Sequence, residues 1–550
     1  MTSKPVKASA VTDARTPRLV FQPSIYQGFQ QGIDLLVEAI KPTLGPLPRS
    51  VAVEKISRTQ PPEILDKGAL IARRIFALQH RDADMGAMLL RQMLWQQYDS
   101  VGDGTATAGV LFQSLFRDGV RYITAGGNAM RVRSYLLNAL AEAKRCLGGM
   151  TTSITGQETI RRLARTHGAD EPAAELLGEA FDVLGEYGRI DIHRGYSRVL
   201  EREYVHGMIW EGGVHAPELI LDAVSRRSAL EDPAIFLSDL DFEDPRQVVP
   251  LIESASRRAR ALVVVASRLS PRALGLFTHV NKTPERFAMF AVKLPADRAA
   301  GAQMLEELAI ITGARPFVQA AGEQPQQVRP DDLGLAKQVW ANQEVFCIVE
   351  DADGGQARSR FLDTLLRRHQ QTADPEARRA LRERIGRLMG ASAALLVGGA
   401  TTSEIDARRD SIKAVVATVR SGLMDGVVPG GGIALLNCRG ELLRTASAAQ
   451  DLDERAAYRM LAQALELPAR QIMVNAGLEA GELLGRLKAA PIDHGVDVRS
   501  GQVISMTEAG ILDPAAVVAS ALEQAVRSAA LALTIDVLVQ HRHPEQSAHP

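Results

Sequence analysis

Residues 101–109 read VGDGTATAG, so one aspartate, Asp103, stands between two glycines and ahead of two threonines. Apolar residues at helical spacing end at this stretch and resume from Val110, which predicts a loop between two helices. The first turn of a helix offers unpaired N–H groups and the positive end of a dipole, and both suit a phosphate. Because Asp103 repels a bare phosphate, a phosphate here requires a divalent cation, and Asp103 predicts magnesium. The same residues also suit a tight turn with a helix cap, so the motif alone leaves both interpretations open.

Two more glycine turns stand near expected helix ends. TLGP at 43–46 closes a helical stretch, and VVPGGG at 427–432 lies next to a long one. Each turn alone is weak evidence. Together they favour a phosphate-binding site at residues 101–109 over a simple tight turn. The GxxxxGK[ST] pattern does not occur, which excludes an ordinary P-loop, and no GxGxxG follows a strand pattern.

The composition is that of a soluble globular chain with more than one domain. Its 550 residues are 46% hydrophobic and 23% charged, and this length predicts two or three domains. Sixty-four Lys and Arg against 65 Asp and Glu give a net charge of -1, so there is no basic field for nucleic acid or an anionic membrane. Three cysteines without CxxC spacing, and no run of about eighteen apolar residues, predict a cytoplasmic protein. The polar residues 1–17 predict a disordered tail, with an organellar transit segment as the alternative.

The middle of the chain changes character. Short β-rich runs at 234–239, 261–267, 287–294 and 345–350 alternate with helical segments, which predicts an α/β domain. Residues 356–390 predict two charged amphipathic helices in an antiparallel hairpin. Acidic residues are interleaved with the arginines there, so we expect a solvated face and not a nucleic-acid surface.

Eight segments, taken in order, carry a resemblance to a known family. They are GIDLLVEAIKPTLGPLPRSVAVEK (32–55), MGAMLLRQM with VGDGTATAGVL (85–111), AGGNAMRV (125–132), AVKLP (291–295), DDLGLAK (331–337), VGGATTSEID (397–406), DGVVPGGGIAL (425–435) and AGILDPAAVVASAL (509–522). Over nearly its whole length the chain resembles the group I chaperonins of the GroEL type, the 60-kDa chaperonin family, as a divergent member.

The resemblance implies a multidomain α and α/β chaperonin fold, with a helical equatorial domain, a small intermediate domain and an α/β apical domain. The implied boundaries are 1–149 and 425–550 for the equatorial domain, 150–205 and 392–424 for the intermediate domain, and 206–391 for the apical domain. It also implies ATP and Mg²⁺ as cofactors and a ring of identical subunits. The implied partners are an unfolded or specific client protein and a lid co-chaperonin.

The matching motifs imply a nucleotide site in the equatorial domain. Asp103 would hold the magnesium ion. The residues implied to contact the nucleotide are Thr43, Leu44, Gly45, Pro46, Lys67, Gly104, Thr105, Ala106, Thr107, Gly431, Asp497 and Asp513. Gly104, Thr105 and Thr107 would cradle phosphates, whereas Gly431, Asp497 and Asp513 would lie on the adenosine side.

The chain departs from the family at two carboxylates. The family aspartate that orients and deprotonates the attacking water aligns with Ala414 without a gap, or with Lys413 with one gap, and neither is a base. A second family carboxylate lies in a Lys-Asp-Gly turn, whereas this chain reads Asp66-Lys67-Gly68. Losing a positioned base costs about 10²- to 10⁴-fold in rate, so we expect ATP binding with impaired turnover. Asp410, one helical turn before Ala414, is the candidate substitute; a surface or helix N-terminal charge is its alternative role.

The apical domain departs too. In the family, a groove of two helices and one extended segment binds clients through large apolar side chains. The apolar residues at or beside the matching positions are Val214, Leu219, Val249, Ile252, Leu274 and Phe277. Glu218, Thr278 and His279 stand where the family is apolar, which predicts a narrowed or altered client range. A small shift in register that brings in Leu276 and Phe277 is the alternative.

Three functions remain open at this point. The first is a folding factor or ring co-subunit that binds ATP and hydrolyses it poorly. The second is an ordinary ATP-hydrolysing chaperonin in which Asp410 or Asp66 is the base. The third is a non-folding scaffold that uses the altered apical surface for one partner.

Overall fold

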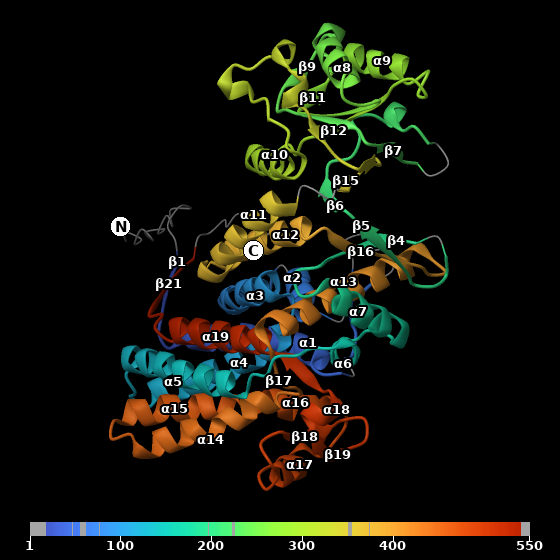
Figure 1. The fold of residues 1–550 in the computed structure, drawn as a ribbon. Helices are drawn as coiled ribbons and strands as arrows, with labels where there is room; N and C mark the ends of the chain where they lie inside the picture. Colours follow the sequence, from blue (N-terminus) through green and yellow to red (C-terminus); the bar gives the residue numbers. More distant parts are fainter. Residues whose placement is uncertain are drawn as a thin grey trace, which may run out of the picture. The chain divides into compact units, whose positions relative to one another are not determined.

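The structure is a computed structural model. It describes residues 18–46, 48–54, 62–65, 67–75, 77–195, 197–222, 226–349, 355–372 and 374–540. The chain divides into two compact units, each with its own hydrophobic core (Figure 1). Unit 1 comprises Met1–Asp182 and Asp410–Pro550, and unit 2 comprises Val183–Arg409. Both ends of the chain therefore fold into one unit, while the boundaries of a third, intermediate domain stay a prediction.

Unit 1 is mainly helical. Its helices are α1 (Ser24–Ile40), α2 (Gly68–Arg74), α3 (Arg81–Val101), α4 (Thr105–Thr124), α5 (Ala129–Met150), α6 (Gln157–Thr166), α14 (Ile433–Ala448), α15 (Leu452–Ala464), α16 (Leu467–Asn475), α17 (Ala480–Leu487), α18 (Met506–Ala509) and α19 (Ala515–Ala532). Helices α7 (Glu171–Leu184) and α13 (Thr402–Asp425) cross the boundary between the units. In α1 the apolar positions expected from helical spacing, Ile33, Leu36, Val37 and Ile40, are all buried.

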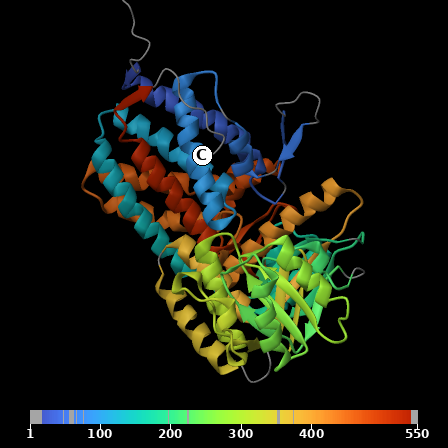
Figure 2. The same cartoon turned by 90° about the horizontal axis from the view of Figure 1, so that it is seen from above.

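The helices of unit 1 pack through these apolar faces. α1 lies along α3, and α19 contacts α3, α4 and α5, as Figure 2 also shows. α15 contacts α4, α5 and α14. The resulting core joins residues from both ends of the chain, so neither end can form it alone.

Short antiparallel strand pairs complete unit 1. β1 (Arg18–Phe21) pairs with β21 (Val537–Gln540), and β2 (Val51–Val53) pairs with β3 (Glu63–Leu65). β17 (Val427–Pro429) pairs with β20 (Leu512–Pro514), and β18 (His494–Asp497) pairs with β19 (Gln502–Ser505). The β17–β20 pair brings the triple-glycine turn next to the segment that carries Asp513.

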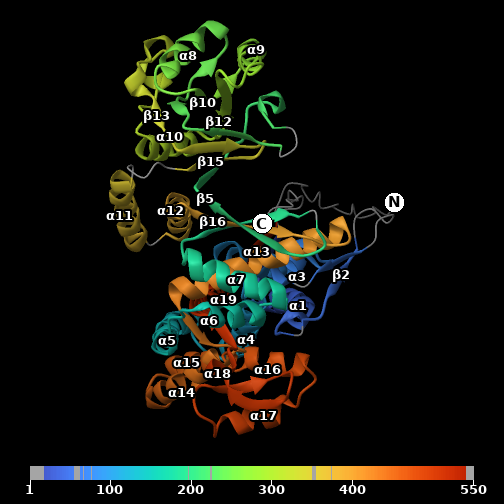
Figure 3. The same ribbon diagram turned by 45° about the vertical axis from the view of Figure 1, so that its right-hand side comes forward.

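Unit 2 contains the expected α/β domain. β8 (Ala234–Leu237), β10 (Ala261–Ala266) and β12 (Ala288–Lys293) form a parallel sheet, with β13 (Gly334–Leu335) antiparallel at its edge. Every residue of β8 and β10 is buried, as expected for strands covered on both faces. In Figures 1 and 3 these strands lie between α10 (Arg298–Thr312) and the pair α8 (Val249–Ser256) and α9 (Pro271–Val280). Three of the predicted β-rich runs thus form this sheet.

Two further sheets and a helical hairpin complete unit 2. β6 (Met208–Glu211), β15 (Val345–Val349), β14 (Gln338–Ala341) and β7 (Ser228–Glu231) form an antiparallel sheet in that order. β4 (Arg189–Arg194) and β5 (Glu201–His206) flank β16 (Ala391–Val397), and β9 (Asp241–Phe242) pairs with β11 (Arg268–Leu269). The predicted charged hairpin is α11 (Gly355–Gln371) and α12 (Pro375–Leu388). Asp374 begins α12 by accepting a hydrogen bond from the Ala377 N–H.

A buried ion pair fastens α12 to α10. Glu307 is fully buried, and its carboxylate accepts hydrogen bonds from Arg384 Nε at 2.7 Å and from Trp210 Nε1 at 2.9 Å. Arg387 lies 3.7 Å from the same carboxylate, and Arg384 also bonds to Glu306. Because a buried charge needs its partners, this network fixes how the hairpin packs on the sheet domain.

We expect Arg384→Met to destabilise unit 2 by about 3 kcal/mol, because Glu307 would lose its closest cationic partner inside the protein. Arg379→Met is the matched control on the same helix, since its exposed pair with Glu383 contributes less than about 1 kcal/mol. Urea unfolding of the two variants measures the difference. Equal urea midpoints in the two variants would show that the buried Arg384–Glu307 pair does not stabilise unit 2 more than the exposed pair does.

Candidate functional site

The loop between α3 and α4 is shaped by two glycines with left-handed backbones. Gly102 (φ 78°) ends α3, with its N–H donating to the Tyr98 carbonyl at 2.8 Å, and Gly104 (φ 79°) begins α4. A Cβ at Gly104 would lie 3.0 Å from both Gln97 Nε2 and a methyl of Val517, so a side chain does not fit. The first N–H donor of the helical ladder of α4 belongs to Ala108, so the N–H groups of residues 105–107 precede it. The expected loop, with free donors at a helix start, is present.

Asp103 stands between these glycines with its carboxylate accessible. The Gly104 N–H donates to its Oδ1 at 2.7 Å, and 52% of the side chain is exposed. Crowding by protein atoms raises the pKa of Asp103, but His167, the Gly104 N–H and Lys67 together outweigh it and hold the pKa below its usual value. The Asp103 carboxylate is therefore ionised at neutral pH.

Gln97 holds the backbone of Asp103 in place. Its Nε2 donates to the Asp103 carbonyl at 2.9 Å, and its Oε1 accepts from Ser520 Oγ on α19 at 2.8 Å. The amide is fully buried, so these bonds are strongly preferred over exposure to water. Gln97 was not among the predicted residues, because nothing in the helical pattern of 85–98 marks it.

His167, directly after α6, lies between two carboxylates and was also not predicted. Its Nδ1 is 3.7 Å from Asp103 Oδ2, its Nε2 is 3.8 Å from Asp513 Oδ1, and Nε2 bonds to the Leu512 carbonyl at 3.0 Å. Burial lowers the pKa of His167, but the two aspartates and the Leu512 carbonyl reverse this and raise it. Burial and the charge of Asp103 raise the pKa of Asp513 above its usual value, against the opposing effects of His167 and the Gly431 N–H.

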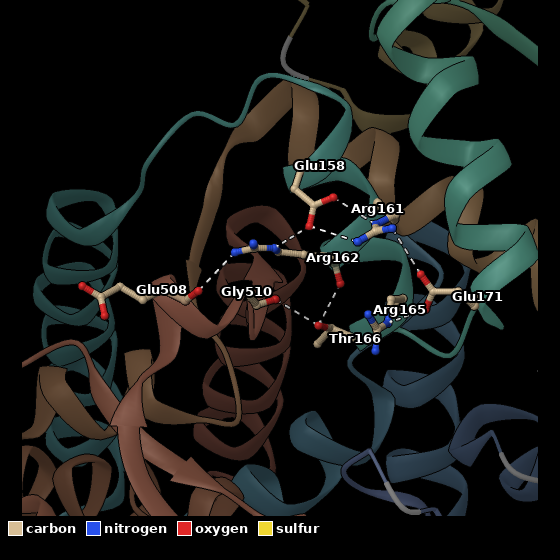
Figure 4. A network of polar contacts seen from close by, with 8 residues as sticks. All are labelled: Glu158, Arg161, Arg162, Arg165, Thr166, Glu171, Glu508 and Gly510. Atoms are coloured by element: carbon tan, nitrogen blue, oxygen red, sulfur yellow. Dashed lines mark hydrogen bonds and ion pairs between the residues drawn. The ribbon is translucent and has the colours of Figure 1, made fainter.

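Polar contacts fasten α6 beside this site (Figure 4). Arg162 donates to the Glu508 carbonyl at 3.2 Å, and Thr166 donates to the Gly510 carbonyl at 3.0 Å. Glu158 orients the guanidinium of Arg162 through a 2.9 Å hydrogen bond. The residue after Thr166 is His167, so these bonds fix the imidazole relative to the segment that carries Asp513.

The TLGP turn is held by a residue from the other end of the chain. Asn475, the last residue of α16, donates from Nδ2 to the carbonyls of Lys41 at 2.9 Å and Leu44 at 2.8 Å. Gly45 has φ 107°, which suits glycine, and the Thr43 hydroxyl donates to the Ile40 carbonyl at 2.7 Å. The 3₁₀ turn Lys41–Thr43 packs against α4, which brings the turn to the helix that follows Asp103.

Gly68, with Lys67 before it, lies beside the start of α4. A Cβ at Gly68 would be 3.1 Å from Thr105 Oγ1, so α2 begins in direct contact with the start of α4. Lys67 acts on Asp103 as a positive charge. Thr105 and Ala106 are buried, while Thr107 is half-buried. Asp66 lies outside the described residues.

The triple-glycine turn lies beside Asp513. Gly431 (φ 67°) and Gly432 (φ 77°) have left-handed backbones, and Gly432 begins α14 in close contact with Ala469 of α16. The Gly431 N–H bonds to Asp513. Asp497 is engaged in its own turn, because its carboxylate accepts from the Arg499 N–H at 3.0 Å and from Ser500 Oγ at 2.6 Å. The described residues hold no group of three His, Cys, Asp or Glu side chains that could bind a metal ion alone.

The family model of the TCP-1/cpn60 chaperonin family matches residues 36–273 and 278–543. The chain belongs to this chaperonin family. Among solved structures it is similar to the chaperonin gp146 from the bacteriophage EL 2 (Pseudomonas aeruginosa), crystallised in the presence of ATP-BeFx. Crystal form I gives a TM-score of 0.72 at 17% identity, covering 96% of this chain and 99% of that one. Crystal form II gives 0.65 at 17% identity, covering 95% and 98%. At this identity the likeness bears on the fold, and the expected chaperonin fold is confirmed.

In this chaperonin, one face of α13 is directed at the Asp103 loop. The pKa of the Tyr98 phenol is raised by burial and then by the charges of Asp410 and Asp103, so both carboxylates act on one phenol. A Cβ at Gly102 would lie 4.0 Å from the methyl of Ala417. Because residues 410, 414 and 417 share a helix face, half-buried Ala414 lies on the face that approaches the loop.

The apical residues expected to bind clients divide into two groups. The side chains of Val214, Leu219 and Phe277 are buried in the core of unit 2 and present no surface here. Val249 is 41% exposed, and Ile252 and Leu274 are half-buried. A shift in register that brings Leu276 and Phe277 into the groove would therefore add no exposed surface from Phe277 in this conformation. Of these two residues, only Leu276, which is half-buried, could contact a client.

No helix within the described residues of this chaperonin combines the length and the apolar composition that crossing a membrane requires.

Proposed function

We propose that this chaperonin binds ATP with a divalent cation at the Asp103 loop, hydrolyses it slowly, and uses nucleotide-dependent domain positions to hold or fold a narrow set of client proteins. The observation that carries the proposal is the ionised, accessible carboxylate of Asp103 between two left-handed glycines at the start of α4. Within a chaperonin, this combination of free N–H donors and a metal-ligating carboxylate suits a nucleotide phosphate.

The donor set fits Mg²⁺. One carboxylate, with nucleotide phosphates and waters to complete the coordination, is the arrangement that Mg²⁺ uses in most phosphate-binding proteins. When bound, the cation neutralises phosphate charge. In this proposal the N–H groups of residues 105–107 and the charge of Lys67 bind the phosphates, while Thr43–Pro46 and Gly431 line the rest of the nucleotide. The Gly104 N–H is already bonded to Asp103 Oδ1, so the role of Gly104 is to let the backbone approach the phosphates. Asp513 lies beside Gly431 for the adenosine side, whereas Asp497 would first have to leave its own turn.

Slow hydrolysis follows from the side chain at position 414. The face of α13 that approaches the Asp103 loop carries a methyl group there, and a methyl group cannot accept a proton from water. Ordinary ATP hydrolysis is the second candidate function, and the shared effect of Asp410 and Asp103 on Tyr98 favours it. Asp410 is exposed and one helical turn from the expected position, so we propose slow hydrolysis as the first choice.

Client capture would use the exposed part of the apical helices. We expect Val249→Glu to weaken binding of an unfolded chain about tenfold, because a partly exposed apolar contact would be replaced by a charge. Light scattering of an aggregating denatured protein, at rising concentrations of the chaperonin, measures this. Val199→Glu, at a 60% exposed valine of the same unit, is the matched control. If both variants suppress aggregation as well as the unsubstituted protein, capture occurs elsewhere.

A self-association surface is available on the β1–β21 pair. Leu19 stands opposite Val539, and Phe21 stands opposite Val537. Their exposed fractions are 53% for Leu19, 48% for Val539, 58% for Phe21 and 46% for Val537. Cross-strand partners share one side of a strand pair, so these four side chains form one exposed apolar face, which supports a homo-oligomeric ring.

We expect Leu19→Asp with Val539→Asp to shift the protein toward the monomer, with more than about 100-fold weaker association, because two apolar side chains that the proposed interface would bury become charges. Mass photometry at nanomolar concentration reads the subunit number directly. Val199→Asp is the control. An unchanged subunit number in the double variant would contradict the proposed surface.

The proposed function is tested by aggregation suppression measured with and without ATP, alongside nucleotide binding by the same preparation. A folding factor is expected to bind ATP and to release its client in an ATP-dependent way. ATP binding without any effect on an unfolded chain would favour a non-folding scaffold. Absence of ATP binding would overturn the proposal.

A further inference from the structure

The imidazole of His167 has one nitrogen committed and one directed at the proposed cation position. A carbonyl oxygen only accepts hydrogen bonds, so the 3.0 Å contact with the Leu512 carbonyl requires the hydrogen on Nε2. In the neutral ring Nδ1 then carries a lone pair, and it faces Asp103 Oδ2 at 3.7 Å. Two electron-pair donors that face each other need a proton or a cation between them.

We propose that His167 Nδ1 is a ligand, together with Asp103, of the divalent cation that enters with the nucleotide, and that this site prefers a transition metal such as Mn²⁺ or Co²⁺ to Mg²⁺. The inference rests on the proposed nucleotide site. It adds a nitrogen ligand from the α6–α7 segment to a position for which the sequence predicted a single carboxylate.

The separation of the two atoms suits one shared cation. Bonds from such metals to imidazole nitrogen and to carboxylate oxygen are each about 2.0–2.2 Å, so two of them span at most about 4.4 Å. The observed 3.7 Å between Nδ1 and Oδ2 lies within that limit. Neither side chain has to change its position by more than a small amount to bind one ion.

The surroundings of His167 are those of a metal-ligating histidine. Such residues donate the other ring N–H to a carbonyl or carboxylate, which fixes the ring and its hydrogen. Here the Leu512 carbonyl accepts that N–H, and Thr166 and Arg162 fasten the preceding residues to the backbone at Gly510 and Glu508. The side chain is only 14% exposed, so water competes weakly for Nδ1.

The chemistry of the donors explains the preference. Mg²⁺ binds oxygen and keeps several waters, whereas imidazole nitrogen suits first-row transition metals. The described residues hold no complete three-residue metal site, so the phosphates of the nucleotide would supply the remaining ligands. The preference should therefore appear for the metal–nucleotide complex.

Pulsed electron paramagnetic resonance of the full-length protein with Mn²⁺ and a non-hydrolysable ATP analogue tests this. We expect a directly bonded ¹⁴N coupling that changes to a ¹⁵N coupling when only the histidines are ¹⁵N-labelled, which separates imidazole from adenine nitrogen. In His167→Gln the coupling should vanish, and the ratio of Mn²⁺-supported to Mg²⁺-supported nucleotide affinity should fall about tenfold or more. His193→Gln, at an exposed histidine of unit 2, should retain the coupling.

The outcomes separate this inference from the proposed function. Nucleotide binding with Mn²⁺ but without a histidine nitrogen coupling would overturn the inference and leave the nucleotide site standing. No nucleotide binding with either metal would overturn both. The labelling result on the unsubstituted protein decides the question even if His167→Gln does not fold.

Discussion

Asp103→Ala is expected to weaken the binding of ATP with its divalent cation by about 100-fold or more. Asp103 is the accessible carboxylate at the start of α4, and its pKa is held below the usual value, so it offers a full negative charge at neutral pH. Without it, the cation that bridges to the phosphates loses its carboxylate ligand, whereas the N–H groups of α4 remain. Fluorescence titration with a labelled ATP analogue, with and without Mg²⁺, measures the change.

The matched control is Asp99→Ala. Asp99 is an exposed aspartate of α3, four residues before Asp103 in the sequence, so its substitution changes the net charge equally and leaves the loop intact. We expect its affinity to stay within about twofold of the unsubstituted protein, as usual for an exposed charge. Equal losses in both variants would mean that general electrostatics, not ligation by Asp103, governs binding.

Ala414→Asp is expected to raise ATP turnover by about 10²- to 10⁴-fold, the usual contribution of a positioned general base. The side chain would stand on the face of α13 between Asp410, which acts on Tyr98, and Ala417, which lies against Gly102. It would thus point toward the loop that carries Asp103. Phosphate release under saturating ATP measures the effect, since binding is then not limiting.

Lys413→Asp is the control for this experiment, because it places the same carboxylate one residue away on an exposed face of α13. It should leave turnover unchanged. Asp410→Asn tests the remaining alternative and should also have little effect. If the unsubstituted protein hydrolyses ATP rapidly and Asp410→Asn abolishes this turnover, then Asp410 is the general base.

Local sequence patterns predicted the elements of the fold well. The loop at Asp103 was predictable because glycines interrupt two helical periods, and β8, β10 and β12 were predictable because buried parallel strands are continuously apolar. The assembly of both chain ends into one unit came from the resemblance, since periodicity carries no information about which distant helices meet.

The least predictable residues are those whose role depends on contacts across the sequence. His167 meets Asp103 and Asp513 only in the folded unit, and nothing in its local sequence distinguishes it from a surface histidine. Gln97 acts through the backbone of Asp103 and through Ser520 of α19. Asp497 shows the converse case, because its own turn already satisfies the carboxylate.

The apical surface illustrates a different limit of sequence reasoning. Val214, Leu219 and Phe277 are apolar and stand at or beside groove positions, yet they fill the core of unit 2. An apolar residue has the same signature whether it packs inside or binds a client, so exposure alone separates them. Val249, Ile252 and Leu274 are therefore the residues that we propose a client contacts.

The most direct test of the central claim is a parallel measurement of ATP binding and phosphate release by the purified, unsubstituted chaperonin. We predict saturable binding that requires a divalent cation, together with phosphate release slower than that of Ala414→Asp by about 10²-fold or more. Binding accompanied by turnover as fast as that of Ala414→Asp would contradict the claim that the missing base limits hydrolysis. Absence of any cation-dependent binding would contradict the nucleotide site itself.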